Sequence, residues 1–422
     1  MNAFPVKNGV MHAENVDLRV IAEKVGTPFY CYSRAAFEER YSTFNRVFAG
    51  TPHLLCYAMK ANSNQAVLKT LAKLGAGMDV VSQGELRRAR AAGVPGERIV
   101  YSGVGKTGAE LAYALDQEIL CFNVESEPEL ALLSQVATAK GATARVSIRV
   151  NPDVDALTHA KISTGTYANK FGIPFDDAPR VYAEAAKLPG LAITGVDMHI
   201  GSQITNLQPF DHATSRLAAL ARELMRQGHR LEHIDIGGGL GVVYRRDDTP
   251  PPEPEDYAQT ILKHTRDLGL KLLFEHGRLL AANSGVLVTS VIYVKRGVGK
   301  TFVIVDAAMN DLIRPTLYEA WHDITPVVEP VPGVAHNRVD VVGPVCESGD
   351  YLAQDREMPE VASGDLLAVH SAGAYGAVQA SSYNTRLLIP EVLVDGEKFA
   401  IIRARPTYEE VISQDIIPPW LA

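Results

Sequence analysis

Eight short apolar segments recur between residues 53 and 276, and longer amphipathic stretches separate them. The stretches at 64–75, 84–93 and 215–228 carry apolar residues at helical spacing, and each ends in glycine, as helices often do. This alternation indicates repeated βα units and predicts a TIM-type (β/α)8 barrel. The apolar segments are residues 53–58, 77–82, 98–103, 119–124, 144–150, 193–200, 233–238 and 271–276.

The sequence pattern changes after about residue 280, where valine-rich segments with alternating apolar residues begin. A period of two is typical of antiparallel strands. The segments are 285–297, 301–309, 338–343, 365–370, 386–396 and 398–405. Residues 29–33 also resemble a strand, although their local pattern leaves open which domain they join. We predict an α/β fold with a barrel over residues 34–280 and a mostly antiparallel β domain from residues 1–33 and 281–422.

The composition limits the partners that such a chain can bind. The 422 residues are 46% hydrophobic and carry a net charge of −8, which disfavours nucleic acid and anionic membranes. The four cysteines are scattered and no histidine cluster has metal-ligand spacing, so we predict neither disulfides nor a metal. Without a signal-peptide pattern or an apolar run of about 18 residues, the expected location is the cytoplasm and the expected partner a small molecule.

Polar residues lie in or just after the carboxyl ends of the predicted barrel strands, where such barrels bind substrate. They are Lys60, Asp79, Ser82, Asn123, Glu125, Asn151, His199, Ser202, Glu275 and Arg278. A lysine is usually a solvated surface residue, but Lys60 directly follows an apolar strand. Desolvation there would lower its pKa and make the amine a nucleophile that forms a Schiff base.

Three consecutive glycines, residues 237–239, follow the seventh apolar segment. A glycine run can be a tight turn, but after a strand it also exposes backbone N–H groups that bind phosphate. Arg278, at the neighbouring strand end, would add a forked cation suited to phosphate or carboxylate. Together they favour a cofactor that carries phosphate.

Glu275 and His199 gain specific roles if that cofactor is pyridoxal 5′-phosphate (PLP). A half-buried carboxylate usually pairs with a cation, and a core histidine usually bonds to backbone. PLP, however, needs a carboxylate at its pyridine nitrogen, so that the protonated ring can accept electrons. A flat imidazole such as that of His199 could stack on the ring.

Seven motifs in order along the chain resemble the fold-type III PLP decarboxylases, and most closely the diaminopimelate decarboxylases. They are YAMKAN (57–62), DVVSQGEL (79–86), HIGSQI (199–204), IDIGGGLG (234–241), DAAMNDLIRPTLY (306–318), GPVCESGD (343–350) and GAYGAVQASSYN (373–384). The resemblance runs from about residue 25 to the end. It implies a PLP-binding barrel with an alanine racemase-like β domain, and decarboxylation of meso-diaminopimelate to L-lysine, the last step of lysine biosynthesis.

The resemblance also implies residue roles. Lys60 would bind PLP covalently, His199 would stack on it, and Cys346 would donate a proton to the substrate carbon. Further cofactor contacts would come from Asp79, Ser202, Gly238, Gly239, Glu275, Gly277, Arg278 and Tyr375. Substrate contacts would come from Arg278, Arg314, Tyr318, Glu347 and Tyr375. In this family the cysteine belongs to the partner subunit, which implies a homodimer with shared active sites. Without that resemblance, Cys346 would be taken as a buried small hydrophobe.

The charges of Arg314 and Glu347 suit the distal carboxylate and ammonium of diaminopimelate. Ornithine lacks that carboxylate and would leave Arg314 unpaired, at a cost of a few kcal/mol. The alternatives are a decarboxylase of ornithine, lysine or arginine, an amino-acid racemase, and a non-catalytic PLP-binding homologue. One departure from the family is His276, where EPGR is usual and this chain has EHGR. We expect this change to affect loop rigidity and to leave the enzyme active.

Overall fold

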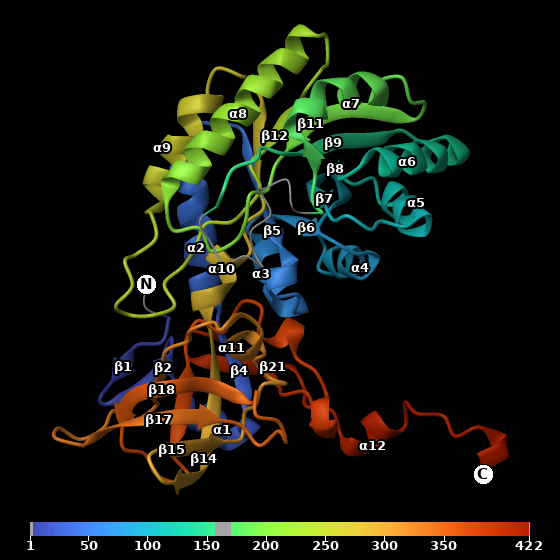
Figure 1. Ribbon diagram of the computed structural model, residues 1–422. Coiled ribbons are helices and arrows are strands. Elements are labelled where there is room, and N and C mark those ends of the chain that lie inside the picture. The colour runs from blue at the N-terminus through green and yellow to red at the C-terminus, as the bar shows by residue number, and fades with distance from the viewer. Residues whose placement is uncertain (1–2, 157–169, 422) are drawn as a thin grey trace. The chain divides into compact units, whose positions relative to one another are not determined.

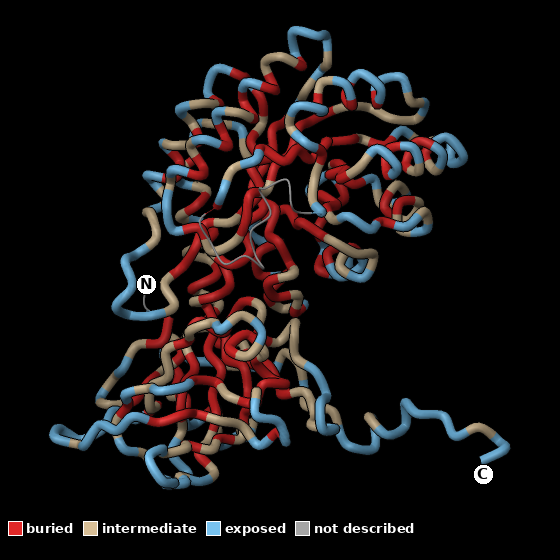
Figure 2. Tube along the Cα trace, in the orientation of Figure 1, coloured by how far each residue is buried: buried red, intermediate tan, exposed pale blue. Residues whose placement is uncertain are grey.

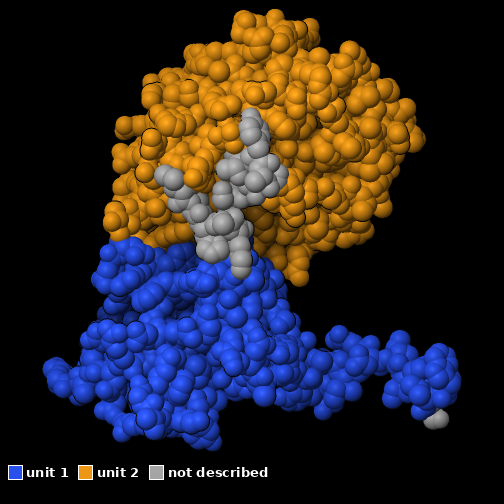
Figure 3. Space-filling view, in the orientation of Figure 1, with its two compact units in different colours: residues 1–36, 244–248, 281–422 blue, residues 37–243, 249–280 orange. Residues whose placement is uncertain are grey.

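The computed structural model describes residues 3–156 and 170–421. The chain divides into two compact units (Figure 3). Unit 1 comprises residues 1–36, 244–248 and 281–422, and unit 2 comprises residues 37–243 and 249–280. Among the described residues, no helix combines the length and the apolar character needed to cross a bilayer.

Unit 2 is a closed parallel barrel with helices on its outside (Figure 1). Around the ring, the strands are β5 (His53–Ala58), β6 (Gly77–Val80), β7 (Ile99–Tyr101), β8 (Cys121–Val124), β9 (Ala144–Asn151), β11 (Leu191–Asp197), β12 (His233–Asp235) and β13 (Lys271–Phe274). The ring closes where β13 pairs with β5. Each strand overlaps one of the eight predicted segments, so the (β/α)8 barrel is confirmed. A two-residue strand, β10 (Ile173–Pro174), pairs with the carboxyl end of β9.

In the part of the chain that the structure describes, eight helices cover the barrel. They are α2 (Arg34–Val47), α3 (Gln65–Lys73), α4 (Gln83–Ala91), α5 (Gly108–Asp116), α6 (Glu127–Lys140), α7 (Ala178–Ala185), α8 (Leu207–Arg226) and α9 (Pro254–Thr265). A polar side chain caps the start of α3, α4, α5, α6 and α8. Ser82 accepts a hydrogen bond from the backbone N–H of Glu85 at the start of α4, and Thr107 forms a capping box at α5. Ser82 therefore has a structural role in the fold. The barrel strands and the inner helix faces are buried (Figure 2).

Unit 1 is built on a mixed sheet. Its main path runs β18 (Tyr351–Pro359), β17 (His336–Val342), β15 (Thr301–Val305), β14 (Gly285–Arg296), β4 (Phe29–Ser33), β20 (Glu391–Asp395) and β21 (Lys398–Arg403). β19 (Leu366–Val369) pairs with β14 and with β16 (Ile324–Pro326). Most pairings are antiparallel, as expected, but β15 with β17 and β4 with β20 are parallel.

Smaller elements complete unit 1. β4, whose place the sequence left open, lies between β14 and β20 in this sheet. The N-terminal segment adds a three-stranded sheet of β1 (Val6–Lys7), β2 (Val10–Ala13) and β3 (Val16–Asp17), followed by α1 (Leu18–Val25). The short helices α11 (Arg314–Tyr318) and α12 (Tyr408–Ile412) follow later in the chain, and α10 (Arg278–Ala281) spans the change from unit 2 to unit 1.

Candidate active site

Lys60 lies in a short 3-10 turn, Met59–Ala61, directly after β5. Its Nζ atom is 3.2 Å from Oδ2 of Asp79, which lies on β6. The Lys60 side chain retains 38% of its exposure, whereas that of Asp79 is fully buried. Oδ1 of Asp79 has no hydrogen-bond partner among the residues that the structure describes. The amine is therefore held by a buried carboxylate and is still accessible to a ligand.

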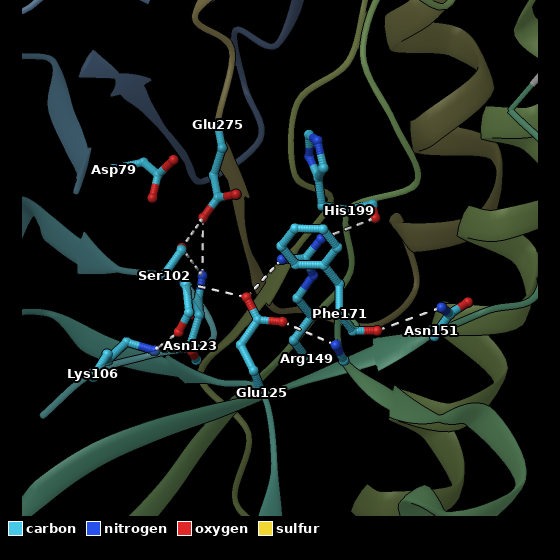
Figure 4. A network of polar contacts seen from close by, with 12 residues as sticks. Asp79, Ser102, Lys106, Asn123, Glu125, Arg149, Asn151, Phe171, His199 and Glu275 are labelled. Atoms are coloured by element: carbon cyan, nitrogen blue, oxygen red, sulfur yellow. Dashed lines mark hydrogen bonds and ion pairs between the residues drawn. The ribbon is translucent and has the colours of Figure 1, made fainter. Parts of the chain in front are cut away.

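Glu275 follows β13 and enters a buried polar network (Figure 4). Its Oε1 atom accepts hydrogen bonds from Nδ2 of Asn123 at 2.9 Å and from Oγ of Ser102 at 3.1 Å. Burial raises the pKa of Glu275 well above its ordinary value, and the nearby carboxylates of Asp235 and Asp79 raise it further. The two hydrogen bonds fix the direction of the Glu275 carboxyl group. A cationic partner would stabilise its ionised form.

Three buried carboxyl groups gather in the barrel interior. Asp197, Asp235 and Glu275 each offer one oxygen, and these oxygens lie within 4.8 Å of one another. Burial raises the pKa of Asp235 to about 7 and that of Asp197 well above its ordinary value. Carboxylates this close repel one another, so shared protons or a cation must compensate them. Such oxygens also suit a metal ion. The prediction of no metal stays a prediction.

The pH dependence of stability follows from Asp235. Its folded pKa of about 7 exceeds the ordinary value of 3.8, so the folded state binds the proton more tightly. The free energy of unfolding of the cofactor-free protein should therefore fall as pH rises from about 4 to about 7. In Asp235→Asn, the Tm difference between pH 5 and pH 8 should shrink by several degrees, whereas exposed Asp176→Asn should retain the wild-type slope. Equal slopes in all three proteins would contradict the assignment.

His199 follows β11, and its ring has a defined protonation state. Nδ1 accepts a hydrogen bond from the backbone N–H of Gly238 at 3.1 Å, which leaves the ring proton on Nε2. Burial lowers the pKa of His199 well below its usual range, and the nearby charges of Arg149 and Lys60 add to this effect. The ring is therefore neutral near pH 7, and its flat face suits stacking on an aromatic ligand.

The glycine loop after β12 requires glycine because backbone surrounds it. A Cβ atom at Gly238 would lie 2.3 Å from the carbonyl oxygen of Glu275, and one at Gly239 would lie 2.5 Å from that of Gly201. Gly239 also has φ +106°, which side chains rarely allow. Its N–H group makes no hydrogen bond to any described residue. An anion such as phosphate could accept from that group.

Arg278 begins α10 and lies at the same barrel end. Its Nη2 and Nε atoms are 3.0 and 3.3 Å from Oγ of Ser202. Gly277 before it packs on the segment that carries Lys60, since a Cβ there would lie 2.7 Å from the carbonyl oxygen of Ala58. The structure thus gathers the predicted cofactor residues of unit 2 at the carboxyl ends of the strands. They are Lys60, Asp79, His199, Ser202, Gly238, Gly239, Glu275, Gly277 and Arg278.

The predicted substrate residues Arg314 and Tyr318 belong to unit 1, where α11 holds them four positions apart on one face. Thr316 Oγ1 donates to the carbonyl oxygen of Gly349 at 2.6 Å, which attaches α11 to the 343–350 loop. Gln379 Nε2 is 3.4 Å from the hydroxyl of Tyr318. Three motifs that are distant in sequence therefore meet around α11.

The 343–350 loop carries Cys346 and Glu347, and both are exposed. The backbone N–H of Cys346 donates to Oδ1 of Asn384 at 3.0 Å. The expectation for an isolated cysteine, a buried hydrophobe, is therefore wrong here, because the thiol-bearing loop lies on the surface. Tyr375 has φ +56°, a strained conformation for a residue with a side chain, and such strain concentrates at functional sites.

Arg314 is a buried cation that has no carboxylate partner among residues 3–156 and 170–421. Its residual exposure is 6%, and no acidic side chain among the described residues forms an ion pair with it. Its Nη1 atom donates to the hydroxyl of Tyr244 at 2.6 Å. Leaving a guanidinium buried in this way costs free energy unless an anion binds it. The geometry therefore favours a ligand that carries a carboxylate or a phosphate.

Comparisons with known proteins identify the family. Residues 34–282 match the family model described as pyridoxal-dependent decarboxylase, pyridoxal binding domain. The chain is 51% identical to a diaminopimelate decarboxylase of Vibrio cholerae, covering 98% of each chain. It is 52% identical to that of Pseudomonas aeruginosa, covering 99% of this chain and 100% of the relative. The chain belongs to the diaminopimelate decarboxylase family.

A solved structure of the same family agrees with this assignment. The diaminopimelate decarboxylase of Helicobacter pylori, complexed with L-lysine, superposes with a TM-score of 0.90 at 41% identity, over 94% of this chain and 99% of that chain. Membership of the diaminopimelate decarboxylase family confirms the resemblance drawn from the seven motifs, and with it the fold class. The roles of individual residues stay predictions.

The sequence pattern did not identify three charged residues in the barrel interior of this member of the diaminopimelate decarboxylase family. Asp197 and Asp235 lie within the apolar segments GVDM and HIDI, and Arg149 lies within SIRV. A charged residue inside an apolar strand is the signal that could have located them. Arg149 donates to Oε1 of Glu125 at 2.7 Å and to the carbonyl oxygen of His199 at 3.3 Å (Figure 4). It therefore helps to fix the backbone that carries the His199 ring.

His276, where the family usually has proline, is buried in an aromatic cluster. Its ring centroid is 4.9 Å from that of Phe44 and 5.4 Å from that of Tyr257, and neither ring nitrogen has a hydrogen-bond partner among the described residues. Burial lowers its pKa to about 3, so the ring packs as a neutral aromatic group. The substitution therefore acts on packing, while Glu275 and Arg278 keep their contacts.

Proposed function

We propose that this protein decarboxylates meso-diaminopimelate to L-lysine and carbon dioxide, the last step of lysine biosynthesis. The observation that carries the proposal is the buried guanidinium of Arg314, which has no carboxylate partner among the described residues. Diaminopimelate keeps a carboxylate at the end that does not react, and that group would pair with Arg314. Ornithine, lysine and arginine have no second carboxylate. The activity named for the relatives supports the same substrate.

The cofactor of this reaction would be PLP, and the barrel residues fit it. Lys60 supplies an accessible amine, the glycine loop supplies the N–H group of Gly239, and Arg278 supplies a guanidinium for the phosphate. Glu275 supplies a fixed, buried carboxyl group for the pyridine nitrogen. Bound PLP would act as the electron sink for the cleaved carbon–carbon bond. A protonated ring nitrogen would also balance the excess of carboxyl groups in the barrel interior.

The chain's own groups would then share the remaining tasks. Lys60 would hold the cofactor covalently, beside the buried carboxylate of Asp79. The neutral ring of His199 would stack on the cofactor, because its Nδ1 bond to Gly238 fixes the ring in place. Arg314 and Glu347 would bind the distal carboxylate and ammonium, with Tyr318 and Tyr375 as further substrate contacts.

We further propose a homodimer in which each active site receives Cys346 of the partner subunit. In the single chain Cys346 is exposed, so its thiol is available to another subunit. Cys346 of the partner subunit would return a proton to the carbon that loses carbon dioxide. The cytoplasmic location likewise stays a prediction.

Mixed dimers test the shared site. Lys60→Ala and Cys346→Ala should each be nearly inactive, because each lacks one group that every active site needs. After the two variants are mixed under conditions that allow subunit exchange, half of the dimers should contain one intact site. Activity should then rise to about a quarter of the wild-type value. No recovery despite exchange proven by mass-tagged subunits would contradict a site shared between subunits.

A substrate panel tests the proposed function. Release of carbon dioxide by the PLP-loaded protein should be measured with meso-diaminopimelate, L-ornithine, L-arginine and L-lysine. We expect turnover of meso-diaminopimelate alone. Turnover of ornithine, arginine or lysine instead would overturn the role of Arg314, and the absence of any turnover or visible cofactor band would indicate a non-catalytic homologue.

A further inference from the structure

Tyr244 holds Arg314 by two different contacts. Its hydroxyl accepts a hydrogen bond from Nη1 of Arg314 at 2.6 Å. Its ring also lies beneath the guanidinium, with Cζ of Arg314 4.7 Å from the ring centroid. A short bond to one nitrogen together with a cation–π contact to one face determines how the planar guanidinium is turned.

Tyr244 itself is fixed by its neighbours in unit 1. Arg245 stacks its guanidinium over Trp321 at 4.5 Å, and the backbone N–H of Arg246 donates to Oδ2 of Asp323 at 3.0 Å. The ring of Tyr244 meets that of His322 edge to face, with centroids 5.2 Å apart. Residues 244–246 are thus attached at three successive positions to the 321–323 segment.

This arrangement has a direct consequence for ligand recognition. A guanidinium has five N–H donors in a fixed fork and binds a carboxylate best through two parallel hydrogen bonds. Tyr244 occupies one Nη1 donor and one face, which leaves the other donors of the fork to face a ligand in one orientation. A guanidinium that could rotate would lose binding free energy on being ordered.

We propose that Tyr244 is a positioning residue that determines specificity, because it orients Arg314 for the distal carboxylate of the substrate. The inference rests on the proposed function. It also gives two tasks to one connection, because the loop between β12 and α9 (Pro254–Thr265) carries both the candidate phosphate-binding glycines 237–239 and Tyr244. Contact with the substrate itself is not required of Tyr244.

The test compares two ligands that differ only in the carboxylate. L-Lysine keeps the carboxylate that Arg314 would bind, and 1,5-diaminopentane is the same molecule without it. In the PLP-loaded Tyr244→Phe protein, the inhibition constant of L-lysine should rise about tenfold, since a hydrogen bond to a charged group is lost. The constant of 1,5-diaminopentane should stay within about twofold of wild type, because its binding needs no guanidinium. KM for meso-diaminopimelate should rise more than kcat falls.

Three further variants complete the experiment. Tyr244→Leu also removes the ring, so it should raise the inhibition constant of L-lysine more than Tyr244→Phe does. Arg314→Lys should raise the inhibition constant of L-lysine but not that of 1,5-diaminopentane, because an ammonium cannot form two parallel hydrogen bonds to a carboxylate. Tyr293→Phe, at a tyrosine of β14 that is 66% exposed, is the matched control and should behave as wild type.

The outcomes separate the inference from the function on which it rests. If Arg314→Lys weakens L-lysine selectively but Tyr244→Phe and Tyr244→Leu do not, the role of Tyr244 is wrong and the proposed function stands. If the inhibition constants of both ligands rise equally in Tyr244→Phe, the role of Tyr244 is structural only, and this result would also overturn the inference. If the wild-type protein does not decarboxylate meso-diaminopimelate, the proposed function itself fails.

Discussion

The Lys60→Ala protein should lose turnover of meso-diaminopimelate by at least roughly 10³-fold, the scale of a lost catalytic group. Lys60 lies at the barrel's carboxyl end, 3.2 Å from a buried carboxylate and still 38% exposed. Without its amine no covalent bond to PLP can form. The purified protein should therefore also lack the visible absorption of covalently bound cofactor, which a spectrum measures directly.

Two companion variants make the result specific. Lys60→Arg keeps a cation beside Asp79 but cannot form the covalent bond, so it should be as inactive as Lys60→Ala. Lys73→Ala removes an exposed lysine of α3 and should leave both activity and spectrum unchanged. Substantial activity in either Lys60 variant, with the fold intact, would sink the assignment of Lys60.

The Glu275→Gln protein should show kcat reduced by roughly 10²–10³-fold, because the pyridine nitrogen of PLP would lose the anionic partner that we propose for it. The amide oxygen of glutamine can still accept the hydrogen bonds from Asn123 and Ser102. The fold and the direction of the side chain should therefore persist. Steady-state kinetics with saturating PLP measure the loss without confusing it with weaker cofactor binding.

Stability should change in the opposite direction in the same variant. The pKa of Glu275 in the cofactor-free protein lies well above the ordinary value of 4.5, so its ionisation opposes folding as pH rises above that value. Glutamine cannot ionise, and Tm of cofactor-free Glu275→Gln should exceed that of wild type by a margin that grows from pH 5 to pH 8. Near pH 4 the two should agree. Unchanged kcat, or a Tm lowered at pH 8, would contradict this role.

The barrel could be predicted because its signal is local and repeated. Segments such as 53–58 are continuously apolar since parallel strands are buried on both faces, and cap residues such as Ser82 begin the helices between them. β18 was not predicted, because its central residues 354–357 are polar or charged and mostly exposed, and they interrupt the apolar pattern. β16, with three half-buried residues, is too short to leave a pattern.

The candidate site could be predicted only in part. Residues at strand ends, such as Lys60 and Glu275, follow from the barrel and from the motifs. The acidic interior residue Asp235 was missed because it lies inside an apolar segment that was interpreted as strand alone. The contact between Tyr244 and Arg314 could not be predicted, since it joins residues 70 positions apart through tertiary structure. Local sequence patterns carry no information on such a pairing.

The most direct test of the proposed decarboxylation is the stoichiometry of L-lysine formed per carbon dioxide released when the PLP-loaded protein acts on meso-diaminopimelate. We expect equal amounts of the two products, and no product from the Lys60→Ala protein. Carbon dioxide without L-lysine, or no reaction by a folded and PLP-loaded wild-type protein, would contradict the proposed decarboxylation.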